Sequence, residues 1–166
     1  MELDKAWPGY MAVVAEARTP KPVFEALRDI VNAHVGNRLM TAQLFEVAKG
    51  RQRRIYSENE AVYPVGGFKP IQGGRWTETI IGRHEIFSSL SIEDMAEVFF
   101  DWKLIQSLGC ESIMNLPVVV AGEVIGTLNL LNEAGYYTAE KVAAARALLP
   151  FATMAFLVDR YSEPVA

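Results

Sequence analysis

The chain has 166 residues, of which 51% are hydrophobic and 22% charged, and its net charge is −4. This length favours one domain with a core large enough to fold without disulfide bonds. The weakly acidic balance argues against nucleic acid or an anionic membrane surface as a partner. The only cysteine, Cys110, leaves no intrachain disulfide and no cysteine-cluster metal site. Because the first residues lack a basic lead and a long apolar run, we expect no secretory signal and a cytoplasmic protein.

Two helices are predicted in the N-terminal part of the chain. Tyr10–Arg18 is suited to a short helix, and apolar residues at helical spacing predict a second helix over Val23–Val35. We therefore expect a single domain over residues 1–166. Its core spans about residues 23–160, and residues 1–22 form a helical extension.

A hairpin is predicted next. Arg38–Ala48 is expected to form one strand, Lys49–Gln52 the turn, and Arg53–Ser57 the returning strand. Four basic residues gather on and beside this turn: Lys49, Arg51, Arg53 and Arg54. Such a cluster can bind an anion, although most basic turns are simply solvated.

A long segment rich in proline and glycine follows, over Glu58–Gly74. Loops of this length in compact domains are often functional. Beyond it the sequence predicts a short helix over Trp76–Ile81, a strand over Arg83–Leu90 and a helix over Asp101–Leu108.

Aromatic residues in this middle segment are candidates for a ligand pocket. Tyr63 and Phe68 lie on the glycine-rich loop, where they can act as a lid. Trp76 and Trp102 can form pocket walls, because aromatic rings commonly line such sites. Packing in the core is the alternative for both tryptophans.

Two alternating strands, Ser112–Val120 and Glu123–Leu131, are the most informative part of the chain. A three-residue loop with Gly122 in the left-handed conformation would pair Asn115 with Thr127 and separate two faces. The apolar face then consists of Ser112, Met114, Leu116, Val118, Val124, Gly126, Leu128 and Leu130. The other face consists of Ile113, Asn115, Pro117, Val119, Ile125, Thr127, Asn129 and Leu131.

Three polar residues stand inside these apolar strands: Asn115, Thr127 and Asn129. Burial of an amide or hydroxyl is costly unless it forms a hydrogen bond. Either a polar ligand or neighbouring protein groups must therefore satisfy them, and both alternatives stay open. We take these residues, with the four aromatic residues above, as the candidate ligand-binding set.

The last predicted element is a helix from Thr138 to about Tyr161. From Val142 to Val158 it is apolar nearly all round, so it must be covered on more than one side. We expect cover from the helix over Val23–Val35 and from a second protomer, and a kink at Pro150. A membrane span is the less favoured interpretation, because an arginine and this proline interrupt the apolar run.

The order of elements predicts an α+β domain built on a central antiparallel sheet of about five to six strands. The run Leu108-Gly-Cys-Glu-Ser112, Leu116-Pro117 and Gly122-Glu-Val-Ile-Gly126-Thr-Leu-Asn-Leu130 resembles the signature end of GAF domains. This resemblance implies terminal helices on one sheet face, and loops with short helices on the other. It also implies a small-molecule pocket under the loop layer, and dimers built through the terminal helices.

The sequence lacks the motifs of three better-known GAF subclasses, and this reduces the number of functions that we expect. The chain lacks the Asn-Lys…Phe-x-x-x-Asp-Glu motif of cyclic-nucleotide-binding members, and Cys110 is not in a bilin-attachment setting. One cysteine cannot close the catalytic disulfide of members that reduce methionine sulfoxide. We therefore expect a stand-alone, dimeric, non-enzymatic sensor that binds an unidentified small organic ligand and signals to a separate partner, with no cofactor identified. The alternatives are a ligand-free dimerisation module and a small-metabolite enzyme that uses Cys110.

Overall fold

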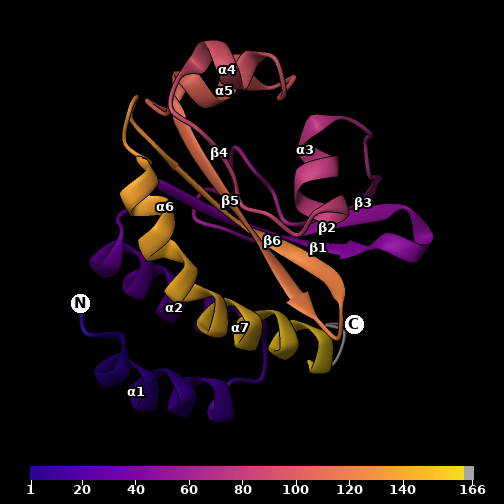
Figure 1. Ribbon diagram of the computed structural model, residues 1–166. Helices are drawn as coiled ribbons and strands as arrows, with labels where there is room; N and C mark the ends of the chain where they lie inside the picture. The colour runs from indigo at the N-terminus through magenta and orange to yellow at the C-terminus, as the bar shows by residue number, and fades with distance from the viewer. Residues whose placement is uncertain (163–166) are drawn as a thin grey trace.

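A six-stranded antiparallel sheet separates a helical layer from a layer of loops and short helices (Figure 1). The structure is a computed structural model that describes residues 1–162. In spatial order the strands are β3 (Gly66–Pro70), β2 (Arg51–Ser57), β1 (Leu39–Glu46), β6 (Glu123–Asn132), β5 (Ser112–Val120) and β4 (Phe87–Ser89). This arrangement confirms the predicted α+β architecture.

The helical layer lies below the sheet in Figure 1. Helices α2 (Pro20–His34) and α7 (Leu149–Tyr161) bury their apolar sides against the strands. The predicted second helix is confirmed and begins three residues earlier, because prolines suit a first helical turn. Helix α1 (Leu3–Glu16) is longer than predicted and lies beneath α2 and α7, on the side away from the sheet.

The C-terminal helix is broken before Pro150 rather than kinked at it. Helix α6 (Ala139–Ala145) leads into a 3₁₀ turn over Arg146–Leu148, and α7 begins at Leu149. Pro150 stands in the first turn of α7, where its missing N–H has no helical partner to lose. The break lets the helix axis change direction without a proline in a helix interior.

Helix α1 supplies part of the cover that α7 requires. The Trp7 ring meets the Phe151 ring edge-on, with centroids 4.9 Å apart. The buried Tyr10 hydroxyl donates a hydrogen bond to the Phe151 carbonyl oxygen at 2.7 Å. From the sequence we expect α2 and a second protomer to cover the apolar surface of α7, whereas α1 of the same chain covers part of it. A dimer through the terminal helices stays a prediction.

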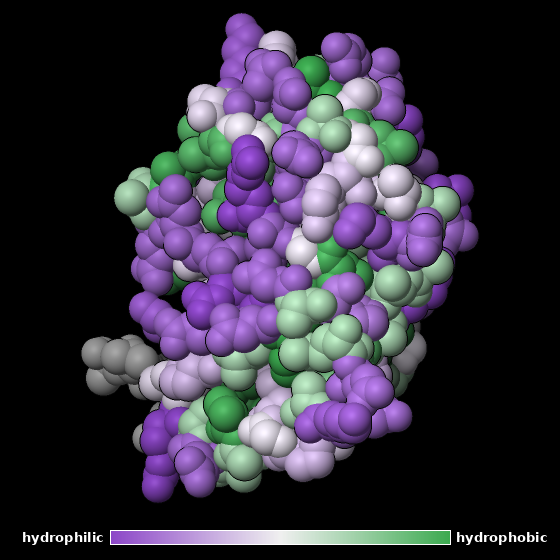
Figure 2. All heavy atoms as spheres, turned by 90° about the vertical axis from the view of Figure 1, so that its left-hand side faces the viewer, coloured by the Kyte–Doolittle hydropathy of each residue, from purple (hydrophilic) through white to green (hydrophobic). Residues whose placement is uncertain are grey.

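Residues 139–161 are apolar and long enough, by composition, to cross a membrane. In the fold this stretch is interrupted by its 3₁₀ turn and contributes Leu148, Phe151 and Phe156 to the core. Figure 2 views the molecule from the side on which α6 lies in Figure 1, and hydrophilic and apolar residues are interspersed there. The stretch therefore contributes to the core on the helix face of the sheet.

The β5–β6 hairpin differs from the predicted register. Ala121 and Gly122 both have positive φ, so they form a two-residue turn that pairs Val120 with Glu123. An extra residue in β6, a β-bulge next to the turn, then shifts the register so that Asn115 pairs with Asn129 instead of Thr127. Away from the turn the predicted faces hold, but the bulge exchanges Val124 and Ile125 between them.

The loop layer contains four short helical elements, of which the first two together cover the predicted Trp76–Ile81 helix. They are α3 (Arg75–Thr77), a π-helix over Glu78–Gly82, α4 (Ile92–Ala96) and α5 (Trp102–Ser107). Strand β4 keeps only three residues of the predicted Arg83–Leu90 strand. Strand β3 was missed altogether within the predicted long loop, and every residue of it is exposed.

The basic cluster also lies differently from its prediction. The hairpin turn is a 3₁₀ turn over Val47–Lys49 that ends at Gly50 with φ of +62°. Arg51 therefore already belongs to β2, and so do Arg53 and Arg54. Because side chains alternate along a strand, the last two arginines project to opposite faces of the sheet.

Candidate functional site

A chain of hydrogen bonds joins three of the predicted site residues across the loop face of the sheet. The Trp76 indole Nε1 donates to Asn115 Oδ1 at 3.0 Å, and Asn115 Nδ2 donates to Asn129 Oδ1 at 2.6 Å. Asn129 Nδ2 in turn donates to Thr41 Oγ1 at 3.2 Å. We call these four side chains the polar relay. Thr41 was missed by the sequence analysis, because only the β1–β6 register places it opposite Asn129.

Thr127 is the exception among the predicted polar residues. Its hydroxyl is fully buried and has no hydrogen-bond partner among the described residues. In the register it stands opposite Gln43 of β1. Of the three predicted polar residues, Asn115 and Asn129 thus already have protein partners, and Thr127 has none among the described residues.

The predicted aromatic residues fall into different surroundings. Tyr63 is buried, and its hydroxyl donates to the Asp101 carboxylate at 2.9 Å. Phe68 is exposed on β3, with the Arg51 guanidinium 3.9 Å from its ring centroid. Trp102 begins α5 and is half-buried. The seven predicted residues therefore do not converge on one cavity.

A cleft of about 280 Å³ opens on the loop face, between the β1–β3 edge of the sheet and the segment around α5. We call it the loop-face cleft. It is lined by Gln43, Gln52, Arg53, Arg54, Val62, Tyr63, Pro64, Gly66, Gly67, Lys69, Phe100, Asp101 and Leu104. Of the predicted set only Tyr63 lines it. This volume lies just below the usual range for ligand pockets, which is about 300–1,000 Å³.

Arg54 is the most unusual group in this cleft. Its guanidinium carbon lies 4.7 Å from the Tyr63 ring centroid, and Nη1 donates to the Pro64 carbonyl oxygen at 3.3 Å. Its Nε is buried without a partner, and no described carboxylate forms an ion pair with it. Burial lowers the pKa of Arg54, because desolvation disfavours its charge.

Gln52 is a second unsatisfied group at the same cleft. Its amide nitrogen donates weakly to the Pro70 carbonyl oxygen at 3.4 Å, and its Oε1 is buried without a partner among the described residues. A donor at Arg54 and an acceptor at Gln52 are thus both free. The basic cluster was the one feature of the sequence that pointed to this place.

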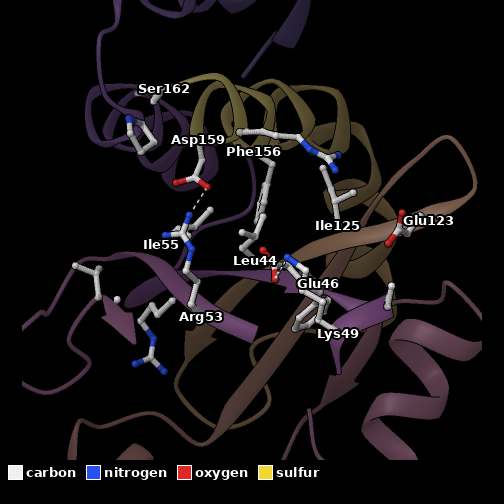
Figure 3. A pocket seen from close by; sticks show the side chains of 17 residues that line it. Leu44, Glu46, Lys49, Arg53, Ile55, Glu123, Ile125, Phe156, Asp159 and Ser162 are labelled. Carbon is white, nitrogen blue, oxygen red and sulfur yellow. Dashed lines mark hydrogen bonds and ion pairs between the residues drawn. The ribbon is translucent and has the colours of Figure 1, made fainter. Parts of the chain in front are cut away.

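A second and larger cleft, of about 680 Å³, lies on the helix face of the sheet. Figure 3 shows it between the end of α7 and strands β1 and β2. Apolar side chains of Leu44, Ile55, Ile125 and Phe156 point into it. Four of its charged groups already form the pairs Arg53–Asp159 and Lys49–Glu46. We take the loop-face cleft as the primary site, because two buried polar atoms without partners belong to residues that line it.

The ion pairs of this helix-face cleft join different elements. Arg53 Nη2 lies 2.9 Å from an Asp159 carboxylate oxygen, the contact drawn as a dashed line in Figure 3. Arg51 and Lys49 both pair with Glu46, at 2.5 Å and 3.4 Å. The Arg51 guanidinium lowers the pKa of Glu46, whereas burial raises the pKa of Asp159 despite Arg53.

No model of a known protein family matches the sequence, and no curated protein sequence matches it significantly. Solved structures do match. The GAF domain of an Acinetobacter phosphoenolpyruvate-protein phosphotransferase superposes with a TM-score of 0.69 at 15% identity, covering 100% of this chain and 96% of that chain. The GAF domain of a two-component sensor histidine kinase from Bacillus halodurans gives a TM-score of 0.66 at 14% identity, covering 85% and 96%.

A GAF domain/HD domain protein from Geobacter sulfurreducens gives a TM-score of 0.63 at 13% identity, covering 84% of this chain and 91% of that chain. The chain has the GAF-domain fold. At these identities the likeness establishes the fold alone. The resemblance predicted from the β5–β6 segment is thereby confirmed as a fold.

Within this GAF fold Cys110 is poorly placed for chemistry. The side chain is fully buried, and burial raises the pKa of its thiol. Thiolates, not thiols, act as nucleophiles, so a buried thiol of raised pKa is a weak one. The described residues also contain no group of three or more histidine, cysteine or acidic side chains that could hold a metal ion.

Proposed function

We propose that this GAF-fold protein is a sensory or regulatory domain that binds a small organic molecule in the loop-face cleft without transforming it. The observation that carries the proposal is the pair of unsatisfied buried groups at this cleft, Arg54 Nε and Gln52 Oε1. Buried polar atoms in folded proteins nearly always have partners, so two free ones in one concave site favour a ligand.

The regulatory part of the proposal is supported by the kind of proteins that carry the same fold. The neighbours described above include domains of a sensor histidine kinase and of a phosphotransferase. The location of the cleft agrees with this, because the loop layer stands on the opposite side of the sheet from the terminal helices (Figure 1). A ligand can shift such a domain only if it has different affinities for two of its states.

Strand β2 is the element through which we propose that the change passes. Arg54 projects to the loop-face cleft, and its neighbour Arg53 pairs with Asp159 near the end of α7. A movement of β2 on binding would therefore reach the terminal helix layer directly. We propose that this layer forms a homodimer in the cytoplasm and contacts a separate partner protein.

Ligand binding is tested by nuclear magnetic resonance of the labelled protein against nucleotides, amino acids, carboxylates and tetrapyrroles. We expect amide shift changes at Gln43, Gln52 and Tyr63. Leu104→Trp should fill the cleft and abolish these shift changes. Leu90→Trp should leave them in place, because Leu90 is similarly exposed but lies outside the cleft. A ligand whose shifts centre on the helix face, or no ligand in the whole panel, would contradict the proposal.

The dimer is tested separately by sedimentation velocity. We expect a dimer at micromolar concentration, with or without ligand. A monomer throughout would remove the proposed dimer. A dimer that binds none of the compounds would favour the alternative function, a ligand-free dimerisation module.

A further inference from the structure

The charged side chains that line the loop-face cleft favour one class of small molecule over others. Four charged side chains line it: Arg53, Arg54, Lys69 and Asp101. Arg53 is neutralised by Asp159 on the helix face. The remaining two cations face one carboxylate, so the cleft keeps a net positive charge when it is empty of ligand.

The carboxylate in the cleft favours the charge of Arg54 through space but does not pair with it directly. Asp101 accepts a hydrogen bond from the Tyr63 hydroxyl at 2.9 Å and forms no ion pair with Arg54. Tyr63 contacts both groups, because its hydroxyl binds Asp101 and its ring lies 4.7 Å from the guanidinium carbon. The ring contact and the hydrogen bond from Nη1 to Pro64 restrain the guanidinium, and Nε has no partner among the described residues. A restrained guanidinium is suited to bind a carboxylate or phosphate through two parallel hydrogen bonds.

Apolar side chains stand beside this charged group. Phe100 is 96% exposed and Leu104 is 40% exposed, and both line the cleft. An exposed phenylalanine beside a concave site offers an apolar surface that can cover the body of a bound ligand. Gln52 also lines the cleft, and its free Oε1 can accept a hydrogen bond from a hydroxyl or amine on the ligand.

We propose that the ligand of the loop-face cleft is a small organic anion whose acidic group binds Arg54 and whose apolar body lies against Phe100 and Leu104. This inference rests on the proposed function and names the class of ligand for it. Lys69, on the exposed strand β3, adds a second positive charge to the lining of the cleft. The bound anion supplies the partner that Arg54 lacks and brings the cleft to electrical neutrality.

The test compares acids with their neutral amides of the same shape. Binding of benzoate, benzamide, acetate, acetamide and inorganic phosphate is measured by calorimetry and by thermal shift. We expect benzoate to bind more tightly than benzamide by about 10- to 100-fold, because hydrogen bonds to charged groups are stronger than neutral ones. Acetate should bind more weakly than benzoate, since it cannot reach the apolar wall.

Two matched variants assign the effect to its residue. Arg54→Gln should remove the preference for the acid, and Arg54→Lys should keep part of it. Arg51→Gln is the control, because Arg51 lies on the same strand but pairs with Glu46 outside the cleft. Lys69→Gln, on an exposed strand, should weaken benzoate binding modestly and serves as the test if Arg54→Gln does not fold.

The outcomes separate this inference from the function on which it rests. Equal binding of benzoate and benzamide would overturn the anion inference and leave a small-molecule sensor. Binding of phosphate but not of benzoate would overturn it in favour of an inorganic-anion site. Binding of none of these compounds would overturn it, and failure of the broad ligand panel as well would overturn the proposed function.

Discussion

The polar relay makes a sharp prediction for single residues, because its members depend on one another. Replacing Asn129 by alanine removes the group that accepts from Asn115 and donates to Thr41. Each buried polar group left without a partner costs about 1–3 kcal/mol. We therefore expect Asn129→Ala to lower the free energy of unfolding, measured in urea, by about 2–4 kcal/mol.

Thr127→Val is the matched control, since its hydroxyl has no partner to lose. We expect it to leave stability unchanged or to raise it by up to about 1 kcal/mol. A large loss of stability in Thr127→Val would mean that this hydroxyl is satisfied by a group outside the described protein atoms. It would thereby point to a buried water or a ligand atom next to β6.

Gly126 is a second residue whose role can be measured. It lies in β6 just beyond the bulge, and a Cβ there would collide with the Gln43 carbonyl oxygen and the Phe156 ring. A backbone carbonyl in a sheet cannot move away cheaply, so Gly126→Ala should destabilise the protein by about 2 kcal/mol or more. In contrast, Gly9→Ala has open space and a helical backbone, and should add about 0.5–1 kcal/mol. Thermal denaturation of both variants checks the pair.

At the level of elements, the sequence predicted those whose pattern is strong. Helix α2 and strands β5 and β6 were found because their apolar spacing is regular over many residues. Strand β3 was missed, because Gly-Gly-Phe-Lys-Pro has no alternation and is exposed on both faces at the sheet edge. The register of β5–β6 was missed for another reason: a bulge adds one residue and leaves no trace in a period-two pattern.

Helix α1 offers a prediction for a whole element. Its attachment depends on the Trp7 ring against Phe151, so Trp7→Ala should weaken the docking of α1 on α7. We expect a loss of stability of about 1–3 kcal/mol, less than for a fully buried tryptophan because Trp7 is half-buried. Hydrogen exchange should accelerate in α1 before it does in the sheet.

The exposed residue Lys5 in the same helix is the control, and Lys5→Ala should change neither measurement. If exchange in α1 is unchanged in Trp7→Ala, then other contacts hold the helix. Such contacts would include the hydrogen bond from Tyr10 to the Phe151 carbonyl oxygen.

For the molecule as a whole, the sequence analysis placed the candidate ligand site in the loop layer, but it did not identify the cleft around Arg54. It placed polar residues of β5 and β6 under the loops, and they do face that layer. It could not show that the two asparagines satisfy each other, because this depends on a register set by the bulge. Nor could it single out Arg54 from its basic neighbours. Only the fold gives Arg53 and Arg51 acidic partners and leaves Arg54 with none among residues 1–162.

The ion pair between β2 and α7 links the stability of the molecule to pH. Burial raises the pKa of Asp159 above its ordinary value of 3.8, and Arg53 only partly opposes this. Between 3.8 and the raised pKa the native state binds the proton more tightly than the unfolded chain does. Stability contributed by this group is therefore present at acid pH and is lost as pH rises through the raised pKa.

Asp159→Asn cannot titrate, so the wild type should lose stability relative to this variant as pH rises from about 3 to 7. Urea unfolding of both proteins at several pH values measures this difference. Arg53→Gln removes the charge that opposes the shift, and should move the loss of stability to higher pH. A difference between wild type and Asp159→Asn that stays constant with pH would show that the ionised carboxylate carries no desolvation cost. The contact between β2 and α7 would then be an ordinary surface ion pair, worth little in stability.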